Sequence, residues 1–288
     1  MKTTLKLLFC SIVYTIVFVA ANVAMPFSPE FKELGASGGL TGLVFMLLNA
    51  VWICFAIYFI IRHTHYRGIK LFINLLFAMF FVAMFMTQIE TLLFGAAFPV
   101  LTKPDIMLIM AAGLFPLLAT IPLLMKFFQN KDNVIEKEKI DIKNIAIKLG
   151  IIGIVYCCVY MLFGYFVAWQ FEELRIFYTG SPEKLSFWGK IVDNIKTNPE
   201  IFPFQILRGI LFGIFVLPLQ FMLNKSKTVF ITGVSLVYLC TAVVLIIPNP
   251  LFPDAVRFGH LIEMTSSMLV FGIITGNILW WKKIASVV

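Results

Sequence analysis

Apolar stretches long enough to cross a membrane recur along the whole chain, and no other feature constrains its fold so strongly. Each stretch has about the 20 residues that an α-helix needs to span a hydrocarbon layer of about 30 Å. Because lipid offers the backbone no hydrogen-bond partners, we expect these stretches to be helices. They cover residues 5–25, 40–61, 71–94, 106–127, 145–171, 203–223, 229–247 and 257–281. The sequence therefore predicts an all-α fold, a polytopic integral membrane helical bundle with about eight transmembrane helices.

The composition indicates that lipid is the solvent for most of the chain. Of the 288 residues, 60% are hydrophobic and only 13% are charged, and the mean hydropathy is +0.95. A soluble core of this size cannot hide so much apolar surface. We expect residues 1–288 to form a single transmembrane domain, multi-pass in the cell membrane, meaning the plasma or inner membrane.

The distribution of lysine and arginine predicts the orientation. Of the 23 basic residues, 15 fall on one side of the predicted spans and 6 on the other, and Arg208 and Arg257 lie inside spans. Since basic residues concentrate in cytoplasmic loops, both termini are predicted to be cytoplasmic. The net charge of +8 then reflects this topology and attraction to anionic lipid, and we expect no nucleic-acid partner.

The long outer loop has the pattern of a helix lying in the membrane interface. Ser181 and Pro182 suit an N-cap followed by a proline in the first turn, and apolar residues around Trp188 then recur at helical spacing. We expect an amphipathic helix near 182–196, which either anchors the loop or covers a site.

The longest cytoplasmic loop, near 128–146, alternates lysine with acidic residues. Such alternation is typical of a solvated helix stabilised by pairs three or four residues apart. We expect a charged extension of a span, with a regulatory contact as the less favoured alternative.

Few ionisable residues lie within the predicted spans, where each costs about 3 kcal/mol or more. Those that lie clearly inside, away from the cytoplasmic ends of the spans, are two acids, Glu90 and Glu263, and three basic residues, Arg208, Arg257 and His260. At a rise of 1.5 Å per residue, all five lie in one layer beneath the outer face. Arg257, His260 and Glu263 are three residues apart and share one helix face. Arg208 is expected to pair with Glu90 or Glu263.

These positions define the predicted functional site. A half-dry pocket can move carboxylate and imidazole pKa values towards neutrality, so the predicted catalytic residues are Glu90, His260 and Glu263. Arginines, amides and hydroxyls at the same level would hold an anionic group. The predicted substrate-binding residues are Gln88, Gln170, Glu172, Glu173, Arg175, Gln205, Arg208, Arg257 and Ser267. We assign no metal ligand, because only one histidine is embedded and no H-E-x-x-H pattern occurs, and the cofactor stays unknown.

The preferred function is a membrane-embedded enzyme of hydrolase or transferase type. Its substrate would be a lipid-linked or membrane-embedded anion held near the outer leaflet. Two alternatives stay open: a proton-coupled transporter or permease for a small anionic or amphipathic solute, and a non-catalytic protein whose buried charges are structural. The expected partners are the lipid bilayer and a lipid or anionic small-molecule ligand, and the oligomeric state is left unknown.

Two four-residue segments resemble motifs of intramembrane proteases. Residues 172–175, Glu-Glu-Leu-Arg, resemble the paired-glutamate motif of CAAX-type proteases, which also use histidines on two further helices, whereas here only His260 is embedded. Residues 35–38, Gly-Ala-Ser-Gly, resemble the G-x-S-G motif of rhomboid proteases, but Ser37 precedes the second span rather than lying in the fourth. Each resemblance would imply peptide-bond hydrolysis, and neither assigns the chain to a family.

Overall fold

The computed structural model describes residues 2–35, 39–93, 95, 98–129, 141–249, 251 and 253–281. This part of the chain is helical and contains no strand, which confirms the all-α prediction. Eight helical segments in it are long and apolar enough to cross a membrane. Every predicted span agrees with one of them to within three residues at either end. The protein is therefore a multi-pass membrane protein.

The spans are single helices or short series of helices. The first four are α1 (Thr3–Ala24), α3 (Gly39–His63), α4 (Gly68–Phe80) with the π-helix η1 (Phe81–Phe85) and α5 (Met86–Leu93), and α6 (Lys103–Phe128). The last four are α7 (Ile142–Phe166) with η3 (Ala168–Gln170), α10 (Ile201–Met222), α11 (Lys227–Val243) with η4 (Val244–Ile246), and α12 (Asp254–Trp280).

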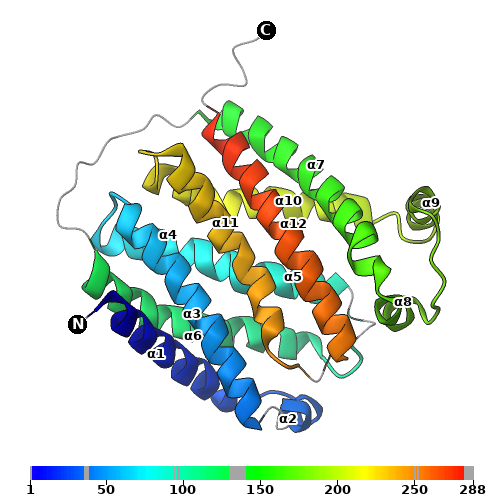
Figure 1. The fold of residues 1–288 in the computed structure, drawn as a ribbon, viewed down its shortest axis with the longest axis horizontal. Coiled ribbons are helices and arrows are strands. Elements are labelled where there is room, and N and C mark those ends of the chain that lie inside the picture. The colour runs from blue at the N-terminus through cyan, green and yellow to red at the C-terminus, as the bar shows by residue number, and fades with distance from the viewer. Residues whose placement is uncertain are drawn as a thin grey trace.

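Three shorter helices lie at one end of the bundle, opposite the start of α1 and the end of α12 (Figure 1). They are α2 (Pro29–Gly35), α8 (Glu172–Thr179) and α9 (Phe187–Thr197). The charge distribution predicts that this end faces away from the cytoplasm. We call it the outer end, and the opposite one the inner end.

The loop between the fifth and sixth spans differs from its prediction. It holds two helices rather than one, and the second begins after Ser186, whose hydroxyl accepts a hydrogen bond from the backbone of Gly189. The predicted start at Ser181 and Pro182 is wrong, because the Ser181 hydroxyl instead accepts from the Glu183 backbone in a local turn. Of the charged loop near 128–146, residues 130–140 lie outside the described part of the chain.

Close packing between α7 and α10 depends on two glycines. A Cβ added to Gly209 on α10 would lie 2.8 Å from the Cα of Gly153 on α7, too close for any side chain. Small residues at such crossings let membrane helices approach backbone to backbone. Arg208 precedes Gly209, so its backbone lies at this crossing.

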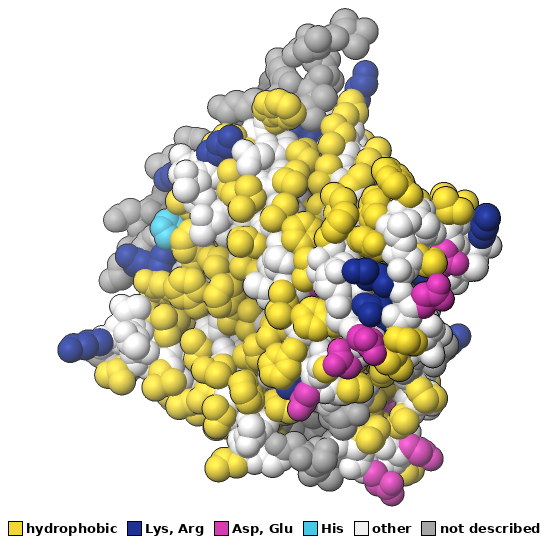
Figure 2. All heavy atoms as spheres, turned by 45° about the vertical axis from the view of Figure 1, so that its right-hand side comes forward, with side chains coloured by type: hydrophobic (Ala, Val, Ile, Leu, Met, Phe, Trp, Pro, Cys, Tyr) yellow, Lys and Arg dark blue, Asp and Glu magenta, His cyan; other side chains and the backbone are white. Residues whose placement is uncertain are grey.

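The surface of the bundle is apolar over most of the face that Figure 2 shows. Large hydrophobic side chains are exposed on several spans, for example Ile16 at 62% and Leu40 at 79%. Acidic and basic side chains gather together on the part of this face formed by α8 and α9 (Figure 2). The apolar surface suits contact with acyl chains, and the charged part suits the headgroup region.

Candidate functional site

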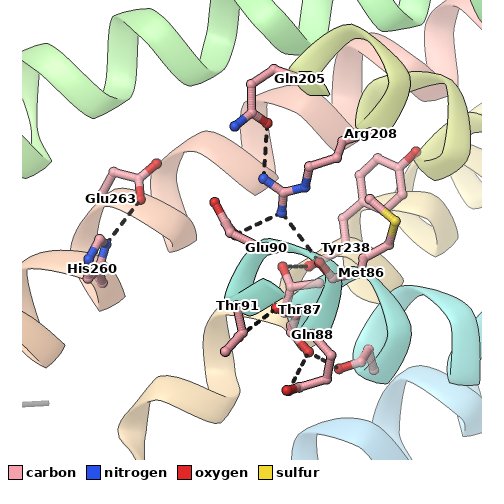
Figure 3. Close-up of polar contacts among 12 residues, drawn as sticks. Met86, Thr87, Gln88, Glu90, Thr91, Gln205, Arg208, Tyr238, His260 and Glu263 are labelled. Atoms are coloured by element: carbon pink, nitrogen blue, oxygen red, sulfur yellow. Dashed lines mark hydrogen bonds and ion pairs between the residues drawn. The ribbon is translucent and has the colours of Figure 1, made fainter. Parts of the chain in front are cut away.

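Arg208 and Glu90 form an ion pair between the sixth and third spans. The Nη2 atom of Arg208 lies 2.8 Å from the Oε2 atom of Glu90, and Nη1 donates to the Gln205 side-chain oxygen at 3.0 Å (Figure 3). The Arg208 side chain is 1% exposed and that of Glu90 is 29% exposed. The ring of Tyr156 lies 5.4 Å from the guanidinium carbon. The carboxylate thus neutralises the buried guanidinium, which would strongly destabilise the fold if it had no counter-charge.

Two buried donors beside this pair have no acceptor among the described residues. Within the described part of the chain, neither Nε of Arg208 nor the side-chain nitrogen of Gln205 has a hydrogen-bond partner. Both side chains are almost fully buried. Buried donors without an acceptor destabilise a fold by about 1–3 kcal/mol each. Within the described residues, Nε of Arg257 is likewise without a partner, so this feature alone does not mark a site. The natural complement of such a donor is an oxygen of a ligand or of an ordered water.

A π-helix directly precedes the turn that carries Glu90. The five residues of η1 widen the third span between α4 and α5, and Glu90 lies five residues beyond its end. The extra residue that a π-helix inserts rotates the following turn relative to a regular helix. On its other side η1 contacts α6 closely, because a Cβ added to Gly113 would lie 2.7 Å from the Cγ of Met84. Such irregular segments are frequent at functional sites.

His260 bridges a hydroxyl group and a carboxylate. Its Nε2 lies 2.9 Å from the hydroxyl oxygen of Tyr178, and its Nδ1 lies 3.8 Å from the Oε2 atom of Glu263, one turn along α12. The shorter distance is a hydrogen bond, whereas the longer one is an ion pair only when the histidine is protonated. The side chains are 22% and 11% exposed for His260 and Glu263. Tyr178, His260 and Glu263 form what we call the acid–base chain.

The acid–base chain and the ion pair occupy one region. Figure 3 shows His260 and Glu263 on the far side of Glu90 from Arg208. The hydroxyls of Tyr156 and Tyr160 on α7 lie within electrostatic reach of both Glu90 and Glu263. The contacts in this region join Arg208 to Glu90 and His260 to Glu263, and the shared layer of these four residues beneath the outer face stays a prediction.

Tyr178 is placed by α8, which lies over the outer end of α12. Its ring stacks on Trp169 at a centroid distance of 6.3 Å and meets the His260 ring edge to face. Burial is the main cause that raises the pKa of the Tyr178 hydroxyl, and the charges of Glu90 and Glu263 raise it further. Tyr178 is therefore a neutral hydroxyl at physiological pH, and it donates to His260 when the imidazole carries its proton on Nδ1.

Two arginines predicted to bind substrate instead donate hydrogen bonds to backbone carbonyls. Arg257 donates from Nη1 to the carbonyls of Leu245 and Ile246, both at 3.0 Å, and pairs with Asp254 at 2.8 Å. It closes the carboxyl end of η4, where unsatisfied carbonyls favour a cation.

Arg175 also donates hydrogen bonds to backbone carbonyls, here in the outer loop. It donates to the carbonyls of Pro182 at 2.7 Å and Trp169 at 2.6 Å, and so ties both ends of α8 together. The structure brings neither Arg175 nor Arg257 into contact with the ion pair of Arg208.

The other predicted binding residues lie at the edge of the cluster or bond locally. Glu172 and Glu173 are exposed in the first turn of α8. Gln170 accepts from Lys184 at 2.8 Å at the outer surface. Gln88 donates to the neighbouring Thr87 hydroxyl at 3.3 Å, and the buried Ser267 donates to the Met264 carbonyl within its own helix at 3.4 Å. Of the predicted set, Gln205 and Arg208 contact one another, and Arg208 contacts Glu90.

No protein-family model matches the chain, and no curated protein or solved structure is detectably similar to it. Of the two protease-like segments, residues 172–175 place their paired glutamates at the exposed start of α8. In the other, Ser37 lies outside the described residues.

Sequence reasoning missed Tyr178 and Asp105. Tyr178 carries no local signal, because its partner His260 is 82 residues away. Asp105 is buried at the outer end of α6 and accepts from the Ser28 backbone and hydroxyl, both at 2.8 Å, and from the Thr102 hydroxyl at 2.6 Å. The Thr102-Lys103-Pro104-Asp105 capping box was a readable signal for that role.

The described residues contain no group of three His, Cys, Asp or Glu side chains able to hold a metal ion. The chemistry on offer is proton transfer. An imidazole between a neutral hydroxyl and a buried carboxylate can accept a proton on one nitrogen while the carboxylate stabilises the resulting cation.

Proposed function

We propose that the protein is a membrane-embedded enzyme of the cell membrane that performs general acid–base chemistry at its outer end. The observation that carries this proposal is the position of His260 between the Tyr178 hydroxyl and the Glu263 carboxylate. With its proton on Nδ1, facing Glu263, His260 accepts from Tyr178 through Nε2. A water or substrate hydroxyl bound beside Tyr178 would give its proton to the Tyr178 oxygen as Tyr178 passes its own proton to Nε2.

The substrate class follows from the donors and the apolar surface around the acid–base chain. Arg208 and Gln205 each carry a buried donor with no acceptor in the described protein, which suits an oxygen of a phosphate or carboxylate. Phe258 and Ile262, beside His260 and Glu263 on α12, are 50% and 52% exposed, as expected of side chains that meet acyl chains. These features support a membrane-embedded or lipid-linked anion as substrate, and hydrolysis or group transfer as the reaction.

The experiment places the purified full chain in nanodiscs made from a total membrane-lipid extract and follows every lipid mass over time. We expect wild type to consume one lipid species and His260→Gln to consume it at least a hundredfold more slowly, within the range of about 10²–10⁴ for general acid–base catalysis. Ser266→Ala is the matched control, because this hydroxyl lies on the same helix and bonds only to backbone carbonyls of its own helix. Conversion that is absent in wild type, or equal in both variants, would contradict the proposal.

A proton-coupled transporter is the second candidate, and one observation favours it. Glu90 follows a π-helix and its ion pair joins two spans, an arrangement in which a protonation event could release one helix from another. Cysteines introduced along the inner halves of α4, α10 and α12 would test it with a membrane-impermeant maleimide. Labelling from both sides of the membrane would support transport, and labelling from one side only would exclude it.

A further inference from the structure

A second candidate binding site lies at the inner end, on the opposite side of the bundle from the acid–base chain. A groove of about 400 Å³ opens there between the start of α4 and the end of α6. Its walls are apolar, formed by Ile69, Phe72, Pro122 and Met125. The volume falls in the range of about 300–1,000 Å³ found for small-molecule sites.

One basic side chain lines this groove, and two more are close in sequence. Lys126 lines it and is exposed. Arg67 directly precedes the lining residues Gly68 and Ile69, and Lys70 follows them with its ammonium 3.8 Å from the centroid of the Tyr66 ring. None of the groove's lining residues is acidic. Within the described part of the chain, no ion pair involves any of these three cations. The groove therefore combines apolar walls with positive charge that no described carboxylate neutralises.

The start of α4 adds to this charge. Arg67 occupies the N-cap position without a side-chain hydrogen bond to the helix, and a Cβ added to Gly68 would meet nothing within 4 Å. The first N–H groups of the helix are thus uncapped by side chains at the edge of the groove, and they carry the positive end of the helix dipole.

We propose that this groove binds an anionic phospholipid from the leaflet at the inner end, which the charge distribution predicts to be cytoplasmic. The phosphate would lie near Lys126 and the first turn of α4, and an acyl chain would lie along Ile69, Phe72 and Met125. A soluble anion would leave the apolar walls without a partner, and a zwitterionic lipid would leave this positive charge uncompensated. An anionic lipid satisfies both.

The test measures binding of phosphatidylglycerol and phosphatidylcholine with identical acyl chains to the detergent-purified full chain by native mass spectrometry. We expect wild type to prefer phosphatidylglycerol, and Lys126→Gln to weaken that binding about fivefold, the effect of about one lysine near a lipid surface. Ile69→Trp fills the groove without changing charge and should weaken binding of both lipids. Lys143→Gln, an exposed lysine outside the groove, should leave binding unchanged.

Equal binding of the two lipids by wild type would overturn the proposal. So would equal losses in Lys126→Gln and Lys143→Gln, which would show a general effect of surface charge. Each variant is first compared with wild type by size-exclusion elution, and Ile69→Ala replaces Ile69→Trp if the larger side chain prevents folding.

Discussion

The carboxylate of Glu90 in the third span lies 2.8 Å from the guanidinium of Arg208 in the sixth, and these two residues are 118 positions apart in the chain. Arg208 is 1% exposed, and its partners are Glu90, the Gln205 side chain, the Met86 carbonyl at 3.5 Å and the aromatic rings around it. This pair holds two spans together at the level of the acid–base chain.

Replacing Glu90 by Gln should lower the free energy of unfolding by about 1–3 kcal/mol, because a buried arginine loses its counter-charge. The effect stays below that of a fully buried pair, since 29% of the Glu90 side chain is exposed. The double variant Glu90→Gln/Arg208→Met should lose less than the sum of the two single losses. Thermal unfolding in detergent measures all three. Strict additivity would contradict a direct energetic coupling.

Replacing Asp105 by Ala should destabilise the outer end by about 1–3 kcal/mol. The carboxylate accepts from Thr102 and Ser28 and so joins the start of α6 to the segment before α2. Glu30→Ala is the matched control, since Glu30 is an exposed acid in the first turn of α2. Thermal unfolding of both variants gives the comparison. Equal losses of stability in Asp105→Ala and Glu30→Ala would contradict a stabilising role for the buried hydrogen bonds of Asp105.

Replacing Arg257 by Gln should lower stability without lowering the conversion rate per folded molecule. Its guanidinium contacts two backbone carbonyls and Asp254, and no described contact joins it to the ion pair of Arg208. The measurement pairs thermal unfolding with the lipid-conversion assay. A large loss of rate at unchanged stability would contradict this prediction and support the substrate-binding role that the sequence predicts for Arg257.

The raised pKa of Tyr178 predicts a pH dependence. Because burial and nearby carboxylates favour its neutral form, Tyr178 stabilises the fold below the ordinary tyrosine pKa of about 10, and this contribution is lost as pH rises through its folded-state value. Tyr178→Phe should therefore lose less stability than wild type on the alkaline side. Unfolding midpoints recorded from neutral to strongly alkaline pH give the comparison. Parallel curves would show that Tyr178 does not titrate in this range.

The spans could be predicted because they depend on a local property, the length of each apolar stretch, whereas the depth of the polar residues stays a prediction from helical rise. The shared face of His260 and Glu263 follows from their spacing alone. The choice of partner for Arg208 could be narrowed to two acids, Glu90 and Glu263, since few carboxylates lie within the spans.

The rest depended on the path of loops and on irregular helices. In the sequence, Arg175 and Arg257 look like cations that are free to bind a ligand. In the structure, both donate hydrogen bonds to backbone carbonyls beside helix ends. Tyr178 reaches His260 only because α8 folds back over α12, and the π-helix before Glu90 has no sequence signature of its own. Long-range contacts of this kind are set by tertiary packing.

The most direct test of the acid–base centre replaces Glu263 by Gln and measures lipid conversion and thermal stability on the same preparation. Glutamine keeps the shape of the side chain and removes the charge that faces His260 across 3.8 Å. We predict a loss of at least about a hundredfold in rate with an unfolding midpoint close to that of wild type. Lost stability with a retained rate would contradict the account and make the buried charges structural.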